Sequence, residues 1–176
     1  MRLESGSCVV RSWRWRDLPT LARQANSIAV SQNMLRFPYP YTRRDAALFL
    51  GFLQLRGILG RPETHFAIEA EADLAGGIGL LIGSGAQRRT AELFYWLGES
   101  LWGRGIATAA VRTLTEYGFR ALRLTRVFAL PFSDNQASCR VLEKAGFRQE
   151  AFQPRSATKD GIVHDQWMYA RTHEPP

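Results

Sequence analysis

The sequence is poor in the residues that build cross-linked or metal-bound folds. Among its 176 residues only Cys8 and Cys139 are cysteines, too few for a disulfide framework or a thiolate metal site. The three histidines, His65, His164 and His173, show no metal-ligand spacing such as H-E-x-x-H. We therefore expect a reduced, cytoplasmic protein that uses no metal.

Long apolar runs are missing as well. No segment approaches the ~20 consecutive apolar residues that span a bilayer, and residues 1–15 lack the apolar core of a secretory signal. Hydrophobic residues make up 45% of the chain and charged residues 22%, which are ordinary values for a globular domain. The composition predicts a single domain over residues 1–171, a tail at 172–176 and no membrane partner.

Lysine is scarce although positive charge is not. The formal net charge is +7, and of 23 basic residues only Lys144 and Lys159 are lysine. Arginine favours bidentate contacts with phosphate or carboxylate, so an anionic ligand is expected. The arginines are dispersed, whereas nucleic-acid-binding proteins usually concentrate them beside aromatic residues. A nucleic-acid-binding module, with steeply salt-dependent affinity, is therefore the weakest alternative, and nucleic acid is not the expected substrate.

Apolar periodicity predicts a mixed α/β (α+β) architecture. Alternation and short apolar runs predict about six to seven strands, at residues 7–15, 64–71, 72–85, 91–98, 125–130, 146–153 and 162–170. Apolar spacings of three and four predict about four helices, at residues 17–28, 42–53, 106–121 and 138–145. Three polar residues stand where helix caps are expected: Asp17, Thr42 and Ser138.

The connections indicate how the strands pair. A helix of about fifteen residues separates the strands at 91–98 and 125–130, so those two strands are predicted to be parallel. The other neighbours are predicted to be antiparallel, which gives a mixed, mostly antiparallel sheet. The glycine-rich segment 76–85 lacks the G-x-G-x-x-G spacing and leads into a strand, so a dinucleotide-binding fingerprint is excluded.

A glycine loop stands directly before the long helix, in the stretch LWGRGIATAAV. Gly103 and Gly105 allow the backbone to approach a ligand without a Cβ atom. The helix that starts near Ile106 adds the positive end of its dipole. This pattern favours an anion cradle, and the alternative is a plain turn between a strand and a helix.

Two segments together carry a resemblance to a known family: LFYWLGESLWGRGIATAAV at 93–111 and NQASCRVLEKAGF at 135–147. The sequence resembles the GNAT superfamily of acyl-CoA N-acyltransferases, and more closely its ribosomal-protein N-alpha-acetyltransferase branch. The first third of the chain, including the FPYPYT loop, resembles that branch too. The phosphate loop of the family begins with Gln or Arg, so Trp102 departs from the pattern while Gly105 and Ala107 match it.

The resemblance implies a GNAT fold, with acetyl-CoA as cosubstrate between two splayed parallel strands. Asn135 would lie beside pantetheine, or would simply cap the following helix. Arg104, Arg140 and Lys144 would reach CoA phosphates, or would be solvated helix charges. The residues expected to bind CoA are Tyr95, Trp96, Leu97, Gly98, Trp102, Gly103, Arg104, Gly105, Ile106, Ala107, Thr108, Asn135, Ser138, Arg140 and Lys144.

The implied reaction is attack of a neutral amine on a thioester, which needs a base and a proton path to the leaving thiolate. Glu92 is the candidate base, and a solvated strand-edge carboxylate is the alternative. By resemblance, Leu142 occupies the place of the tyrosine acid of many relatives. Ser138 is the substitute, unless it only caps its helix. Direct transfer is expected, because Cys139 is interpreted as a small packed thiol instead of a nucleophile.

The acceptor implied by the resemblance is a primary amine, most closely a protein or peptide N-terminus. Phe37, Tyr39 and Tyr41 in the FPYPYT loop are expected to wall the acceptor pocket, and burial in the core is the alternative. A small-molecule amine or antibiotic acetyltransferase and a non-catalytic CoA-binding regulator stay open as other functions. Because dimers are common among the relatives, a homodimer is also expected.

Overall fold

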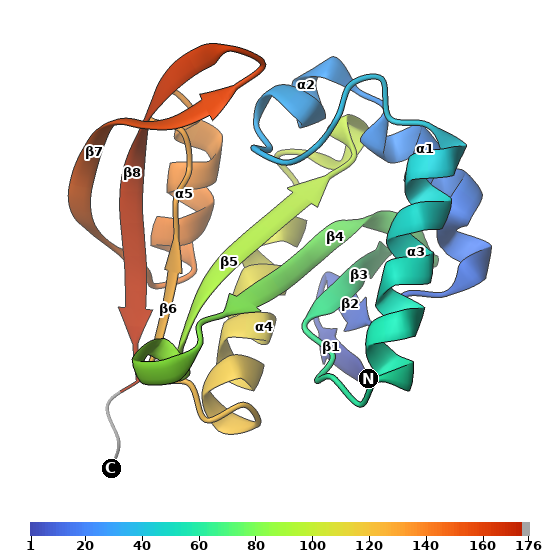
Figure 1. Ribbon diagram of the computed structural model, residues 1–176, viewed down its shortest axis with the longest axis horizontal. Coiled ribbons are helices and arrows are strands. Elements are labelled where there is room, and N and C mark those ends of the chain that lie inside the picture. The colour runs from blue at the N-terminus through green and yellow to red at the C-terminus, as the bar shows by residue number, and fades with distance from the viewer. Residues whose placement is uncertain (174–176) are drawn as a thin grey trace.

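One eight-stranded sheet organises the chain in the computed structural model, which describes residues 1–173 (Figure 1). Its order is β1-β2-β3-β4-β5-β6-β8-β7, and β5–β6 is the parallel pair among antiparallel neighbours. The strands are β1 (Arg2–Ser5), β2 (Cys8–Arg11), β3 (His65–Ala70), β4 (Asp73–Ile82), β5 (Thr90–Leu97), β6 (Arg126–Ala129), β7 (Arg148–Lys159) and β8 (Ile162–Thr172).

Five α-helices in residues 1–173 cover both faces of this sheet, with α1 and α3 on one face and α4 and α5 on the other (Figure 1). They are α1 (Leu18–Ala25), α2 (Ile28–Gln32), α3 (Arg43–Ile58), α4 (Ile106–Arg120) and α5 (Gln136–Lys144). Short 3₁₀ turns lie at Trp15–Asp17, Gly85–Gln87 and Glu99–Leu101. The predicted mixed sheet and its parallel pair are confirmed.

The sequence prediction undercounts the elements at the N-terminal end. The predicted strand 7–15 ends at Arg11, and β1 before it forms a hairpin with it that was not predicted. The predicted helix 17–28 is two helices, because α1 ends at Ala25 and Ser27 caps α2 by accepting from the Val30 N–H. At the other end, the predicted tail starts too early. Thr172 still belongs to β8, and residues 174–176 lie outside the described residues.

The three predicted caps have different outcomes. Thr42 caps α3 in a reciprocal box with Asp45, as predicted. Asp17 does not cap α1, because its carboxylate is buried and accepts from Arg11 Nη1 and Nη2 at 2.8 and 2.9 Å. Charge-assisted bidentate bonds outweigh one bond to a backbone N–H. Ser138 is not the cap of α5 either; Asn135 is, through its Oδ1 at 3.0 Å from the Ser138 N–H.

Two apolar clusters hold the helices to the sheet. The larger one lies under α4, whose Ala110, Val111 and Leu114 are fully buried at helical spacing. The other joins α1 and α3 to the opposite face and includes Trp96 of β5. Because side chains alternate along a strand, β5 contributes to both clusters and separates them. No helix within residues 1–173 is long and apolar enough to cross a membrane.

Where β5 and β6 separate, the sheet opens. Their pairing runs only from Thr90 opposite Arg126 to Glu92 opposite Phe128. Farther along β5, the Gly98 N–H bonds to Ala75 O of the β4 side, whereas the Leu97 carbonyl accepts from Trp102 Nε1. Since backbone groups of successive strand residues face opposite edges, the backbone of Tyr95 also faces the open edge.

Candidate active site

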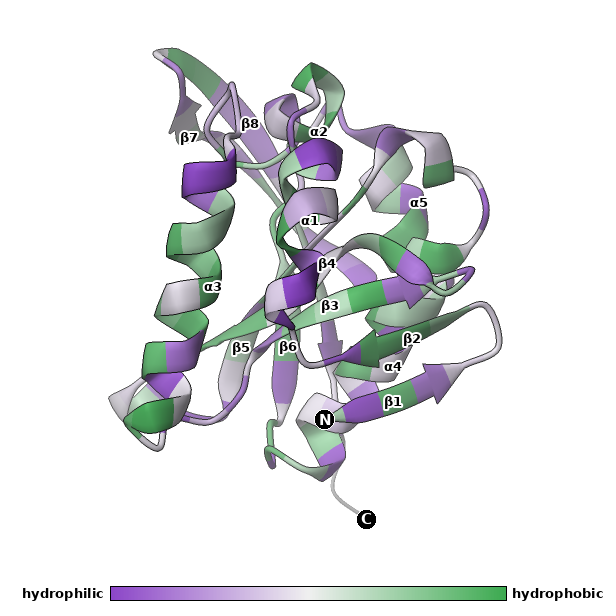
Figure 2. Ribbon diagram, turned by 90° about the vertical axis from the view of Figure 1, so that its right-hand side faces the viewer, coloured by the Kyte–Doolittle hydropathy of each residue, from purple (hydrophilic) through white to green (hydrophobic). Residues whose placement is uncertain are grey.

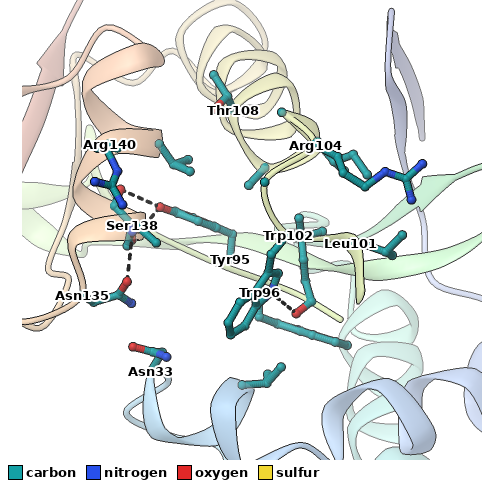
Figure 3. Close-up of a pocket in the computed structure, with 18 of the residues that line it drawn as sticks. Asn33, Tyr95, Trp96, Leu101, Trp102, Arg104, Thr108, Asn135, Ser138 and Arg140 are labelled. Carbon is teal, nitrogen blue, oxygen red and sulfur yellow. Dashed lines mark hydrogen bonds between the residues drawn. The ribbon is translucent and has the colours of Figure 1, made fainter. Parts of the chain in front are cut away.

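A cavity of about 560 Å³ lies at this opening in the sheet. It is bounded by the end of β5, the glycine loop, the first turn of α4, the α5 helix and the end of α2 (Figure 3). Every residue predicted to bind CoA lines it except Gly98. Gly98 faces the other way, and a Cβ atom there would collide with Gln24. The prediction for Gly98 is therefore not supported by its position.

The glycine loop has the backbone of an anion site. Gly103 and Gly105 have φ of +75° and +77°, in the left-handed region that favours glycine. Gly105 is the N-cap residue of α4 and supplies no side-chain cap. The first N–H groups of α4 are therefore not capped by that residue's side chain, and they lie beside the cavity. Uncapped donors together with the helix dipole favour a bound phosphate.

Trp102 stands where the family pattern has Gln or Arg, and it fixes the loop in another way. Its indole Nε1 donates to the Leu97 carbonyl at 2.9 Å. This bond ties the glycine loop to the end of β5 (Figure 3). The departure from the pattern therefore leaves the backbone cradle intact.

The three predicted phosphate-binding cations differ in what they contact. The Arg104 guanidinium pairs with Glu71 of the β3–β4 turn and extends away from Tyr95 and Ser138 (Figure 3). Arg140 and Lys144 lie on α5, line the cavity and pair with no carboxylate within 4.0 Å in the part of the chain that the structure describes. The α5 pair is therefore better placed than Arg104 for an anionic ligand.

A hydroxyl pair faces the cavity from two different elements. Tyr95 Oη of β5 lies 2.6 Å from Ser138 Oγ and 3.2 Å from the Ser138 carbonyl (Figure 3). Burial raises the pKa of the Tyr95 phenol far above its ordinary value, so the phenol stays protonated. The sequence predicts that Tyr95 binds CoA, but no pattern in it pairs the Tyr95 side chain with Ser138, although strand alternation places that side chain on the face toward α4 and α5.

The other side chains considered for catalysis do not line the cavity. Leu142, at the place of the family's tyrosine, is fully buried in the larger cluster. Cys139 is buried, and burial raises the pKa of its thiol, which agrees with a packed thiol. Glu92 is half-buried and does not line the cavity. Burial raises the pKa of its carboxyl, and the charge of Arg36 opposes that rise.

The FPYPYT loop divides between core and surface. Tyr41 is buried in the smaller cluster, so the burial alternative holds for it. Phe37 packs edge-on against Tyr41 and Trp96, with ring centroids 5.2 and 5.4 Å apart. Tyr39 is exposed. None of the three lines the cavity. Residues near α2 line it instead, and no sequence pattern pointed to them: Val30, Asn33 and Met34.

The β7–β8 hairpin closes against the same loop. Lys159 is buried and donates from Nζ to the Phe37 carbonyl at 2.9 Å. Lys159 also lies 3.5 Å from Asp160 at the hairpin turn. This contact joins residues 122 positions apart in the chain and holds the loop and the hairpin together above the splayed strands (Figure 1).

Comparison with known proteins identifies the class to which this fold and site belong. Residues 8–148 match the model of the acetyltransferase (GNAT) domain. Because that match covers most of the chain, the chain belongs to the GNAT acetyltransferase family.

Curated relatives are similar over part of their length. The probable N-acetyltransferase YjcK of Bacillus subtilis is 36% identical over 110 residues, 61% of each chain. A spermidine N(1)-acetyltransferase of Escherichia coli is 26% identical over 134 residues, 76% of this chain and 69% of its own. The matched part is thus about three-fifths of the length of YjcK.

Solved structures are similar over nearly the whole chain. RimJ of Mycobacterium smegmatis, in complex with CoA-disulfide, superimposes with a TM-score of 0.82 at 26% identity, covering 98% of this chain and 86% of that one. A Salmonella typhimurium acetyltransferase that modifies the N-terminal serine of ribosomal protein L7/L12 gives 0.82 at 23% identity, covering 99% and 100%. At 23% identity, the similarity to the Salmonella typhimurium structure shows a shared fold alone.

Proposed function

We propose that this chain transfers the acetyl group of acetyl-CoA directly to a primary amine, and that the acceptor is a protein or peptide N-terminus. The observation that carries the proposal is the cavity itself. It is lined by the N-terminus of α4, which has no side-chain cap, by a loop whose two glycines have left-handed backbone angles, and by the open edge of β5. These three features fit a pyrophosphate followed by an extended amide-containing arm.

Acetyl-CoA would lie along this cavity as follows. The N–H groups between Gly103 and Thr108 would receive the pyrophosphate, with Arg140 and Lys144 supplying positive charge from α5. The open edge of β5 would pair with the pantetheine arm through the backbone of Tyr95. A β5 N–H at the end of the arm would stabilise the oxyanion of the tetrahedral intermediate.

The proton steps are assigned to Glu92 and Ser138. Glu92 would take the ammonium proton, directly or through water, so that the neutral amine attacks the thioester carbonyl carbon. When the carbon–sulfur bond breaks, Ser138 Oγ would donate to the leaving thiolate, and solvent would restore the proton. Tyr95 would be a positioning residue, since its protonated phenol holds the Ser138 hydroxyl at 2.6 Å.

Charge in the cavity favours a singly charged acceptor over a polyamine. Asp134 is the one carboxylate among the residues that line the cavity, which also include Arg104, Arg140 and Lys144. A polyamine acceptor would call for a cluster of carboxylates, which the described residues that line this cavity do not supply. The resemblance of residues 93–111 and 135–147 to the ribosomal-protein N-alpha-acetyltransferase branch also supports a protein N-terminus. The spermidine acetyltransferase at 26% identity keeps a small amine as the second candidate.

The test is acetyl-CoA turnover, followed as release of free thiol, against N-terminal peptides, polyamines and aminoglycosides. The proposal predicts turnover with peptides that is lost when their N-termini are blocked. Turnover with polyamines alone would show that the acceptor is a small amine and would contradict the proposed peptide acceptor. Tight CoA binding without turnover of any of these acceptors would favour a non-catalytic CoA-binding regulator.

A further inference from the structure

A second cavity, of about 440 Å³, shares no lining residue with the cavity assigned to acetyl-CoA. Three segments line it: residues 13–15 between β2 and α1, the second half of α3, and residues 61–65 before and at the start of β3. Figure 2 shows the C-terminal half of α3 beside the start of β3, where two of these segments meet. A cavity of this size suits a small ligand.

Two tryptophans give this cavity planar apolar walls that are held in place. The Trp13 ring packs edge-on against Phe49 of α3, with ring centroids 5.4 Å apart. It also lies over Gly77, where a Cβ atom would come within 3.0 Å of Trp13 Cζ2. Trp15 is exposed, and its Nε1 donates to Gln54 Oε1 of α3 at 3.2 Å. Rings fixed in this way offer a planar ligand a stacking surface at little cost in side-chain entropy.

The charged residues that line the cavity are mostly arginines. They are Arg14, Arg56 and Arg61, and none of them lies within 4.0 Å of a carboxylate in the part of the chain that the structure describes. Glu63 is the one carboxylate among the described lining residues, and its Oε2 lies 3.6 Å from the Met1 ammonium. Three guanidiniums around one cavity produce a positive field that favours a bound anion.

His65 lines the same cavity from the first position of β3. Burial and, to a smaller extent, the charge of Arg56 lower the pKa of this imidazole to about 4, so the ring is neutral at pH 7. Arg56 itself lies over the Phe52 ring, 5.7 Å from its centroid, and such a contact leaves the guanidinium charged. The His65 ring also packs against Phe94 of β5, with centroids 5.2 Å apart. His65 is therefore a fixed, neutral ring that a ligand in the cavity would contact.

We propose that this cavity binds a small aromatic anion, with its planar group against the two tryptophans and its phosphate or carboxylate among the three arginines. The juxtaposition of fixed aromatic walls with guanidiniums that have no carboxylate partner within residues 1–173 carries the inference. An inorganic anion would leave the indole surfaces unused, and a neutral aromatic molecule would leave the arginines without a partner. Because the cavity is separate from the acetyl-CoA cavity, the proposal does not rest on the proposed function.

The first experiment is calorimetric titration of the full chain with 1-naphthyl phosphate, 1-naphthoate, 1-naphthol and inorganic phosphate, with and without excess CoA. At least one naphthyl anion should bind about tenfold or more tightly than either naphthol or phosphate, whether or not CoA is present. The tighter of the two naphthyl anions identifies the anionic group. No binding of either anion, naphthol binding equally well, or loss of binding when CoA is added would overturn the proposal.

Substitution of exposed arginines locates the bound anion. Arg14→Gln and Arg61→Gln change exposed side chains, and each should weaken binding of the naphthyl anion by about tenfold. The matched control is Arg148→Gln, which removes the same charge from an exposed residue of β7 at the other edge of the sheet. Affinity should be unchanged in that control. An equal loss in all three variants would show a general effect of net charge and would overturn the assignment of the site.

Imidazole NMR signals give the position of the ligand independently. The chain has three histidines, and among them His65 lines this cavity. Its signals, assigned with His65→Gln, should shift when the naphthyl anion is added, whereas those of His164 should stay in place. A sample that binds the anion without a shift at His65 would contradict the proposed site.

Discussion

Tyr95 of β5 and Ser138 of α5 are joined by a 2.6 Å contact between their hydroxyl oxygens, across the opening where the sheet splays. The same serine is fixed at its N–H by Asn135 Oδ1 at 3.0 Å. Ser138 is therefore held from both the strand and the helix cap, with its hydroxyl beside the cavity. Single substitutions of Tyr95 and Ser138 therefore test whether the two hydroxyls act together.

Tyr95→Phe should lower kcat by about 10- to 100-fold, because Ser138 Oγ loses the partner that orients it. Ser138→Ala should have a similar effect, and the double variant should be little worse than either, as expected for residues that act together. The KM for acetyl-CoA should change far less than kcat. Tyr39→Phe, on an exposed tyrosine, is the control. Additive losses in the double variant would contradict a coupled pair.

Gly105→Ala should weaken CoA binding by more than tenfold. A Cβ atom at φ +77° costs about 1–2 kcal/mol and shifts the N-cap of α4 from the position that points its N–H groups at the cavity. Gly57→Ala, in the last turn of α3, should leave CoA affinity unchanged. Isothermal titration with CoA measures both. Unchanged affinity in Gly105→Ala would remove the glycine loop from the site.

Arg104→Ala should raise the KM for acetyl-CoA less than Arg140→Ala does. The Arg104 charge is already paired with Glu71, whereas Arg140 on α5 has no carboxylate partner within residues 1–173. Steady-state kinetics at fixed salt measures the comparison, because phosphate contacts weaken as salt rises. The reverse order would show that Arg104 leaves Glu71 when CoA binds.

The pH dependence of kcat/KM should show an acid limb from Glu92. Burial raises the pKa of this carboxyl above its ordinary 4.5, and only the ionised form accepts a proton. Activity should therefore rise with pH through that raised pKa. Glu92→Gln should abolish the limb and most of the activity while CoA still binds. A limb that persists in Glu92→Gln would assign the base to another group.

His65 should make the fold less stable in mild acid. Burial, with a smaller effect from Arg56, lowers the pKa of this imidazole from 6.5 to about 4. Because the unfolded chain binds the proton more readily, stability is full above pH 6.5 and falls as pH drops toward 4. The loss should be about 1–3 kcal/mol. Urea unfolding at pH 7 and pH 5 measures it, and His65→Gln should remove this part of the pH dependence.

Much of the sheet was predictable because its strands carry local signals. The apolar run at 91–98 and the helix period after Ile106 appear in β5 and α4 nearly as predicted. β1 was missed because four residues alternate too briefly to stand out. The break between α1 and α2 was missed because Ile28 continues the apolar spacing of α1, although Ser27 starts a new helix.

The parts of the candidate site that depend on local backbone conformation were predictable from the sequence. The parts that depend on contacts between distant side chains were not. The positive φ values of Gly103 and Gly105 follow from residue type and position. Asp17 fails as a cap because the side chain of Arg11, six residues earlier at the end of β2, takes its carboxylate, and helix-cap patterns do not include such a contact. The Tyr95–Ser138 contact spans 43 residues, and the pairing of Arg104 with Glu71 spans 33.

The most direct test of the central claim is calorimetric titration of the purified chain with acetyl-CoA, followed by addition of an N-terminal peptide and mass spectrometry of that peptide. We predict saturable binding of one acetyl-CoA per chain, weakened more than tenfold in Gly105→Ala, and a single acetyl group on the peptide's α-amine. Absence of acetyl-CoA binding by the wild-type chain would contradict the assignment of the cavity as the acetyl-CoA site.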